Sequence, residues 1–211
     1  MIHHKERNKR VPSFREIRYQ EKKDNIIRKA SYIFAEKGYQ KTTLEEIAAE
    51  LKLTKGSIYH YFNGKEDILF QSLLRAHSLA NESLTQVCAI PDIPPDERLK
   101  LAIKRHVDVI TQRFVFSSLR QQDLMLHGEM REKIIRERDK FQVMLSNIIK
   151  EGMDQGIFRN DNLKIIVLAL LGAINWIGFW YSEDGPFNPE MIGEHIAEYL
   201  VNGLALKCDS H

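Results

Sequence analysis

Apolar residues recur at intervals of three and four along most of the chain, and no stretch alternates with the two-residue period of a β-strand. The spacing is regular within residues 43–65, where the apolar stripe consists of Leu44, Ile47, Ala48 and Leu51. Such a stripe predicts a short amphipathic helix, and a second short helix follows after a tight turn. The pattern indicates an all-α fold.

Hydroxyl residues mark the starts of both short helices. Thr43 is followed three residues later by a glutamate, the capping-box combination that satisfies two free N–H groups. Thr54 suits the start of the second helix, which we expect to end at Phe62, and Asn63-Gly64 suits a left-handed helix end. Two short capped helices with a polar and aromatic outer face describe a helix-turn-helix unit.

The second helix of such a unit enters the major groove of DNA with its N-terminal residues against the base edges. Ile58 and Phe62, four positions apart, would hold this helix against the domain. An unrelated pair of helices would explain the caps but not the small, hydroxyl and aromatic residues on the outer face. The predicted DNA-binding residues are Thr42, Thr43, Thr54, Lys55, Gly56, Ser57, Tyr59, His60, Tyr61 and Lys65.

Residues 24–74 resemble the DNA-binding domain of tetracycline-repressor (TetR) type regulators. The positions that carry the resemblance are Thr43, Ile47, Ala48, Gly56, Ser57, Ile58, Tyr59, Tyr61, Phe62, Lys65 and Glu66. It implies a homodimer that binds palindromic double-stranded operator DNA and leaves it when a small hydrophobic inducer binds. The alternatives are a TetR-type repressor of an efflux or stress gene and an architectural DNA-binding protein without an inducer.

The charge distribution agrees with a DNA-binding N-terminal part. Residues 1–65 contain fifteen Lys/Arg and eight Asp/Glu, so they carry a net charge of +7, whereas the rest of the chain carries −5. A basic domain attached to an acidic body is typical of proteins that bind nucleic acid. We assign 1–20 to a flexible basic arm, 21–66 to a three-helix DNA-binding domain, and 67–211 to a helical ligand-binding and dimerisation domain.

Three prolines between Pro91 and Pro95 form the clearest break in the chain. Before them we expect a first helix that starts between Ser13 and Asp24 and ends at Gly38, and a long helix from Lys65 to about Val87. Beyond them every segment has helical periodicity. The expected helices of the body are 96–114, 129–155, 162–182 and 189–206, with a short segment at 119–126.

The apolar run 165–181 raises the question of a membrane span. It is slightly short for one and contains Asn175, so we predict that it is buried in the core and in a dimer interface instead. The resemblance implies that the last two long helices pair with their copies in a second subunit. Small residues that would allow close approach there are Ala169, Gly172, Ala173, Gly193 and Ala197.

Aromatic, sulfur-containing and isolated polar residues of the body are candidates for an inducer cavity, although residues of these types also form ordinary cores. An amide within an apolar helix, such as Asn175, needs a hydrogen-bonding partner, which a ligand, another side chain or a second subunit could provide. The predicted ligand-binding residues are His106, Phe114, Met125, Phe141, Met144, Asn175, Trp176, Phe179 and Trp180.

The segment 170–176, with Trp180-Tyr181 and Asp184-Gly185-Pro186 after it, resembles one branch of the family. That branch represses fatty-acid or steroid-side-chain degradation genes and releases DNA on binding acyl-coenzyme A (acyl-CoA). An arginine expected near the second tryptophan is absent here, where Gly178, Phe179 and Ser182 stand. Arg113, Arg120 and Lys164 are the candidates to replace it.

The remaining features favour a cytoplasmic regulator over an enzyme. Cys88 and Cys208 are far apart and lack metal-site spacing, which favours reduced thiols. The first residues contain no apolar stretch of the kind found in secretory signals. We find no nucleophile–base pair or metal-ligand spacing, so we expect no enzymatic activity, no metal and no cofactor.

Overall fold

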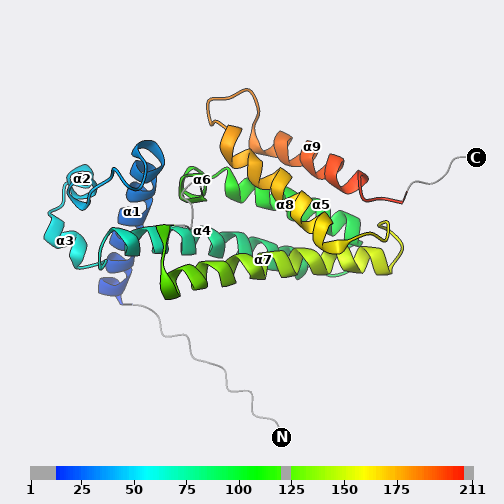
Figure 1. Ribbon diagram of the computed structural model, residues 1–211, viewed down its shortest axis with the longest axis horizontal. Helices are drawn as coiled ribbons and strands as arrows, with labels where there is room; N and C mark the ends of the chain where they lie inside the picture. The colour runs from blue at the N-terminus through cyan, green and yellow to red at the C-terminus, as the bar shows by residue number, and fades with distance from the viewer. Residues whose placement is uncertain (1–12, 120–124, 207–211) are drawn as a thin grey trace, which may run out of the picture.

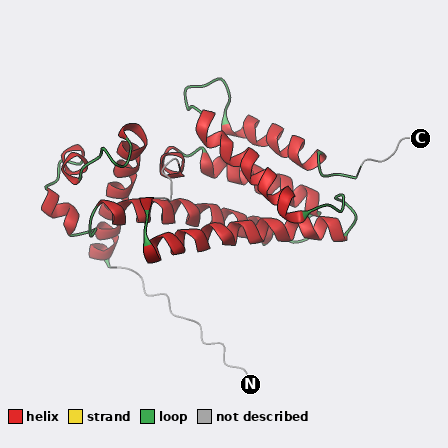
Figure 2. Ribbon diagram, viewed as in Figure 1, coloured by secondary structure: helices red, strands yellow, loops and turns green. Residues whose placement is uncertain are grey.

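The computed structural model describes residues 13–119 and 125–206, and these are helical apart from short connections and one isolated β-bridge (Figures 1 and 2). The prediction of an all-α fold is confirmed. The helices are α1 (Phe14–Lys37), α2 (Leu44–Glu50), α3 (Lys55–Tyr59), α4 (Lys65–Cys88), α5 (Pro95–Ile110), α6 (Arg113–Leu119), α7 (Gly128–Asp154), α8 (Leu163–Trp180) and α9 (Pro189–Asn202). Arg120, Cys208 and the first twelve residues of the predicted arm lie outside the described ranges.

Helix α1 begins earlier than the predicted boundary between the arm and the domain. The Glu16 N–H donates to the Ser13 Oγ at 3.2 Å, and the Ser13 N–H donates to Glu16, so a complete capping box starts the helix at Phe14. Residues 14–20 are therefore helical, and the start of the helix lies within the expected range from Ser13 to Asp24, inside the segment assigned to the arm. The capping box is the local signal that sets the start of the helix.

The N-terminal domain has its own apolar core at one end of the molecule. Ile26, Ala30 and Phe34 of α1 pack with Ile47 of α2 and Ile58 of α3, and all five are buried. The core continues into the first turns of α4. Figure 1 shows α4 leaving this domain and running into the body, so one rigid helix belongs to both parts.

The body consists of α4 and α7 lying side by side, with α5, α8 and α9 on one side of them (Figure 1). The contact between α5 and α9 is close. A Cβ atom on Gly193 would lie 3.4 Å from the Lys104 Cα, and Ala197 is fully buried. These two residues were expected at a dimer interface, but they face α5 of the same chain.

One predicted boundary in the body was wrong. The helix expected over 96–114 ends at Ile110, and after Thr111 and Gln112 a separate helix, α6, begins. Phe114 therefore belongs to α6 and packs against the cores of both domains. The apolar stripe that runs from α5 to Phe114 hid the break that precedes α6. Of the short segment expected at 119–126, residues 120–124 lie outside the described ranges.

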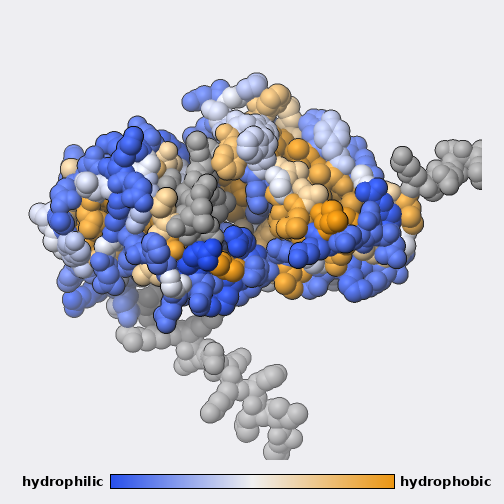
Figure 3. Space-filling view, viewed as in Figure 1, coloured by the Kyte–Doolittle hydropathy of each residue, from blue (hydrophilic) through white to orange (hydrophobic). Residues whose placement is uncertain are grey.

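Helix α8 buries one side and exposes the other. Ile166, Leu170 and Ile174 face the core, whereas Leu168 and Trp176 are exposed. The helix is long and apolar enough to cross a membrane, and only 28% of it is buried within the chain. Figure 3 shows apolar surface gathered over this part of the body. The expected burial on all sides is therefore only partly provided by the chain itself.

Candidate DNA-binding surface and ligand cavity

Helix α3 is positioned by a cap at its start and by one buried side chain. The Ser57 N–H donates to the Thr54 Oγ1 at 3.1 Å, and the two hydroxyls lie 2.9 Å apart. Ile58 is fully buried beneath the helix. The helix ends at Tyr59 rather than at Phe62, and Gly64, with φ 147°, is the N-cap of α4 and does not cap α3.

The outward face of α3 carries most of the predicted DNA-binding side chains. Lys55, Tyr59 and His60 are exposed, as are Thr43 and Thr54 at the two helix starts. The Lys55 ammonium lies 2.6 Å from Glu45, and this carboxylate raises the lysine pKa. Lys55 therefore remains charged, but a contact with DNA would require it to leave Glu45.

Gly56 is exposed on the same face, and the protein has room for a side chain there. A Cβ atom would meet only the Thr54 Oγ1, at 3.8 Å. The packing of this chain therefore does not require a glycine, although glycine weakens a helix relative to alanine. A residue without a side chain at this position suits the close approach of another molecule.

Two predicted DNA-binding residues point into the protein. Thr42 is 1% exposed, and its hydroxyl donates to the Gly38 carbonyl at 2.9 Å. The Lys65 ammonium donates to the carbonyls of Tyr39 at 2.8 Å and Thr42 at 2.9 Å, and it lies 4.3 Å from the centre of the Tyr39 ring. Both side chains hold the connection between α1 and α2, so in this structure they do not belong to the outward face of α3.

Tyr61 is intermediate in exposure. Its ring lies 4.8 Å from that of Tyr19 in the early turns of α1. The nearby Lys23 ammonium lies 5.5 Å from the centre of the Phe62 ring. The first turns of α1 are thus attached to the turn that follows α3, which explains how they remain ordered without a core of their own.

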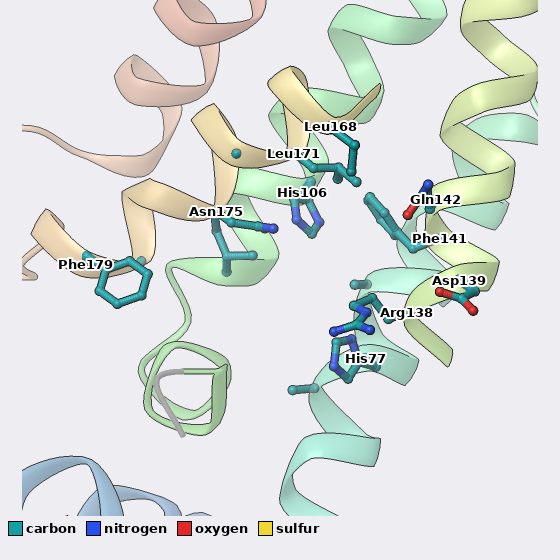
Figure 4. A pocket seen from close by; sticks show the side chains of 15 residues that line it. His77, His106, Arg138, Asp139, Phe141, Gln142, Leu168, Leu171, Asn175 and Phe179 are labelled. Atoms are coloured by element: carbon teal, nitrogen blue, oxygen red, sulfur yellow. The ribbon is translucent and has the colours of Figure 1, made fainter. Parts of the chain in front are cut away.

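The body contains a cavity of about 550 Å³ between α4, α5, α7 and α8 (Figure 4). A cavity of this size suits a small organic ligand. Apolar side chains, among them Ala76, Ala80 and Leu171, provide much of the wall. Four of the predicted ligand-binding residues line it, namely His106, Phe141, Asn175 and Phe179.

The other predicted ligand-binding residues lie elsewhere. Met125 accepts a hydrogen bond from Gln40 at the N-terminal domain, and Met144 packs at the edge of the core beside Thr85. Trp176 is 62% exposed and stacks on Phe179, and Trp180 is also exposed. These two tryptophans and Phe114 do not line the cavity. The apolar pattern of α8 does not reveal which of its sides faces inward.

The sequence reasoning missed the polar residues of the cavity. His77 on α4 and Arg138, Asp139 and Gln142 on α7 line it, and Figure 4 shows Arg138 beside His77. They belong to helices with ordinary amphipathic patterns, so no local signal distinguishes them from solvated surface. Arg113 and Lys164, two candidates for contacting CoA, do not line this cavity.

His106 is the most unusual group in the cavity. Its side chain is 7% exposed, its ring lies 4.5 Å from that of Phe141, and neither ring nitrogen has a hydrogen-bond partner within the described chain. The Asn175 amide points toward it (Figure 4). Burial lowers the pKa of His106 to about 4, and the approach of Asn175 opposes this shift only in part. The ring is therefore neutral at physiological pH, with one donor and one acceptor facing the cavity.

Comparison with known proteins defines the class of this protein. Residues 92–204 match the family described as "Tetracyclin repressor-like, C-terminal domain", and residues 26–71 match "Bacterial regulatory proteins, tetR family". The chain belongs to the TetR family. It is a ligand-responsive, DNA-binding transcription regulator, and its family is not one of enzymes.

Three relatives illustrate the range of the similarity. The HTH-type transcriptional repressor KstR2 of Mycobacterium tuberculosis is 24% identical over 87% of this chain and 92% of its own length. The fatty acid metabolism regulator protein of Bacillus subtilis is 26% identical over 85% of this chain and 93% of its own. The crystal structure of AibR in complex with isovaleryl coenzyme A and operator DNA has a TM-score of 0.75 and 26% identity, covering 87% of this chain and 97% of AibR.

Proposed function

We propose that this protein is a cytoplasmic homodimeric repressor that binds palindromic operator DNA through α3 and leaves it when an acyl-CoA thioester occupies the cavity of the body. The observation that carries this proposal is the apolar cavity with a neutral, unpartnered histidine inside it. Two of the relatives support the choice of ligand, because one is named for fatty acid metabolism and another binds isovaleryl coenzyme A.

The outer side of α8 supports the homodimer. Large apolar side chains lie exposed there and on α9, among them Ile165, Leu168, Trp176, Met191 and Tyr199. Large exposed apolar side chains gathered on one part of a protein mark an interaction site. A two-fold axis through it would bury the same patch of both copies. This arrangement also explains the apolar α8 without a membrane.

A dimer matches the DNA-binding surface as well. A helix of five residues reads few bases, whereas two helices about 34 Å apart can read both halves of a palindrome in successive major grooves. On this proposal Lys55, Gly56, Ser57, Tyr59 and His60 meet the bases and nearby backbone. Thr43, Thr54 and Tyr61 flank them.

The cavity favours a ligand with an apolar chain and one neutral hydrogen-bonding group. Leaving a buried polar group without a partner costs about 1–3 kcal/mol, so a ligand carbonyl that accepts from His106 gains over a plain hydrocarbon. The thioester carbonyl of an acyl-CoA is such a group. Arg138 and His77 line the same cavity and offer cationic or hydrogen-bonding contacts to the coenzyme portion.

In the experiment, the protein is titrated into labelled DNA that flanks its own gene. Acyl-CoAs of increasing chain length are then added to the complex. We expect specific binding by fluorescence anisotropy and its loss on adding acyl-CoA, with free fatty acid and CoA as controls. Gly56→Ala should fold and melt normally, since the site has room for the methyl group. The free energy with which it binds specific DNA should weaken by about 1–3 kcal/mol if the glycine lies against a base.

Each outcome bears on a different part of the proposal. If acyl-CoA binds but the operator affinity is unchanged, regulation by this ligand is excluded. If another hydrophobic compound releases the DNA and acyl-CoA does not bind, the repressor proposal stands and the acyl-CoA assignment is wrong. Equal losses by Gly56→Ala on specific and random duplexes would contradict the placement of Gly56 against bases.

A further inference from the structure

A second hollow lies at the junction of the DNA-binding domain and the body. It has a volume of about 370 Å³ and is walled by α1, α4 and the start of α6. Three arginines line it, each from a different helix: Arg28 of α1, Arg75 of α4 and Arg113 of α6. Asp24 is the one acidic residue of its wall. The hollow is therefore distinctly cationic.

None of the three arginines forms an ion pair among the described residues. Elsewhere in the same domain Lys37 lies 3.3 Å from Glu46, and in the body Lys150 lies 2.9 Å from Asp154. Asp24 accepts a hydrogen bond from Gln20 at 2.9 Å and forms no salt bridge with the arginines in the described part of the chain. Like charges gathered without counter-charges repel one another, so an anion would relieve the repulsion.

The hollow is supported by fixed groups. The Arg113 guanidinium lies 4.9 Å from the centre of the Tyr32 ring, which holds it at the wall. Close by, the buried hydroxyls of Ser31, Ser72 and Ser118 join α1, α4 and α6, with oxygen separations of 3.0 Å and 3.2 Å. The three helices that supply the arginines are thus in direct contact, so the arginines are presented from a packed junction.

We propose that this hollow is a binding site for a small phosphate-bearing molecule, separate from the inducer cavity. The planar guanidinium matches the geometry of phosphate oxygens, and it binds them through paired, charge-assisted hydrogen bonds. Three such groups around 370 Å³ suit a diphosphate or a nucleotide phosphate. The occupant would contact both domains at once, because Arg28 lies in one of them and Arg113 in the other.

The position of the hollow favours a small anion over the DNA backbone. Figure 1 shows α3 at the far end of the N-terminal domain, whereas α6 lies on the side of α1 that faces the body. Gln112, Arg113 and Phe114, which complete the wall, belong to the body. A duplex that contacts α3 would have to pass around α1 to reach them.

The test uses the full-length protein and inorganic pyrophosphate, with sodium chloride at matched ionic strength as the reference. We expect calorimetric binding of one pyrophosphate per chain and a rise in melting temperature that chloride does not produce. Arg28→Gln and Arg113→Gln should each weaken pyrophosphate binding by about tenfold or more, as expected for a lost charge-assisted hydrogen bond. Arg113→Lys keeps the charge but loses the paired geometry, so it should fall between wild type and Arg113→Gln.

Arg131→Gln is the matched control, because this arginine is exposed on α7 and does not line the hollow. The proposal is wrong if pyrophosphate binds no better than chloride, or if Arg131→Gln loses as much affinity as Arg28→Gln. It is also wrong if Arg28→Gln and Arg113→Gln weaken operator binding while wild-type protein ignores pyrophosphate. That result would assign the arginines to DNA.

The phosphates could be those of a free metabolite or those of the coenzyme in the proposed inducer. A competition experiment between acyl-CoA and pyrophosphate distinguishes these two sources of the phosphate groups. If acyl-CoA displaces pyrophosphate and Arg113→Gln weakens both ligands, the coenzyme supplies the phosphates. If both ligands bind together, the hollow serves a second, phosphorylated molecule. Pyrophosphate binding is measured without acyl-CoA, so this proposal stands or falls independently of the inducer assigned above.

Discussion

Helices α3 and α8 both present a side to the outside of the chain, but the two sides differ in chemistry. The outward residues of α3 are polar, basic or aromatic with a hydroxyl, as at Lys55 and Tyr59. Those of α8 are apolar, as at Leu168 and Trp176. The first surface is stable in water without a partner, whereas the second exposes side chains that water disfavours.

This difference shows which of the two surfaces is stable in a single chain and which one needs a partner to cover it. Helix α3 anchors itself with Ile58 alone and leaves the rest of its surface available for a polar partner. Helix α8 buries Ile166, Leu170 and Ile174 on one side and still exposes a second apolar side. We therefore expect α3 to bind DNA from a preformed surface and α8 to be covered permanently by a second copy.

The largest predicted effect comes from making the outer side of α8 resemble that of α3. Trp176→Arg would place a charge at the centre of the proposed contact, which should convert the dimer to monomers in light scattering. Because two linked sites bind far more tightly than one, operator affinity should fall by about 10²–10⁴-fold. Helix content by circular dichroism should not change, since Trp176 is exposed.

Val143→Arg provides the matched control for that substitution. Val143 is also a large apolar residue, 58% exposed, but it lies on α7. It should remain dimeric and bind the operator normally. A Trp176→Arg protein that stays dimeric would place the interface on another surface.

The N-terminal domain could be predicted in detail because its signals are local. The Thr43 and Thr54 caps and the buried positions Ile47 and Ile58 are all present as expected. The internal contacts of Lys65 were missed because its partners are backbone carbonyls more than twenty residues away in sequence. A positive charge in a basic domain does not indicate that the lysine binds these internal carbonyls.

The body could be predicted as a set of helices but not as a set of contacts. An amphipathic pattern predicts that one side is buried, and α8 is apolar all round, so its pattern does not distinguish core, cavity and interface. Ala197 and Gly193 of α9 were placed at a dimer contact because small residues allow close approach, and they face α5 of the same chain instead. Only the packed structure shows that Asn175 faces the cavity and Trp176 does not.

The second largest predicted effect is the pH dependence of stability that His106, in the cavity of the body, should cause. The folded-state pKa of His106 is lowered to about 4, below its ordinary value of 6.5, so the unfolded chain binds a proton more readily. The stability linked to this group is fully present above pH 6.5 and is lost as the pH falls toward 4. The loss should reach roughly 3 kcal/mol, since one pKa unit corresponds to about 1.4 kcal/mol.

Chemical denaturation of wild type and His106→Phe between pH 4 and pH 7, at one protein concentration, measures this difference. The variant should lack the His106 contribution, so the two curves should diverge as the pH falls. The charged or titratable groups that share the cavity are His77, Arg138 and Asp139, and they remain in both proteins. The exposed His60→Phe is the control, and parallel curves for His106→Phe and wild type would exclude a buried neutral imidazole.

The smallest effect tests where the DNA-binding surface ends. Lys65→Met removes the donor to the Tyr39 and Thr42 carbonyls, so the free energy of unfolding should fall by about 1.5–3 kcal/mol. Lys41→Met, at an exposed loop position nearby, should change it by no more than about 0.5 kcal/mol. The dependence of operator affinity on salt then decides the role of Lys65. A phosphate contact contributes about 0.9 to the slope of log K against log salt, so an internal lysine should leave the slope unchanged. A shallower slope with unchanged stability would return Lys65 to the DNA-binding surface and extend that surface beyond α3.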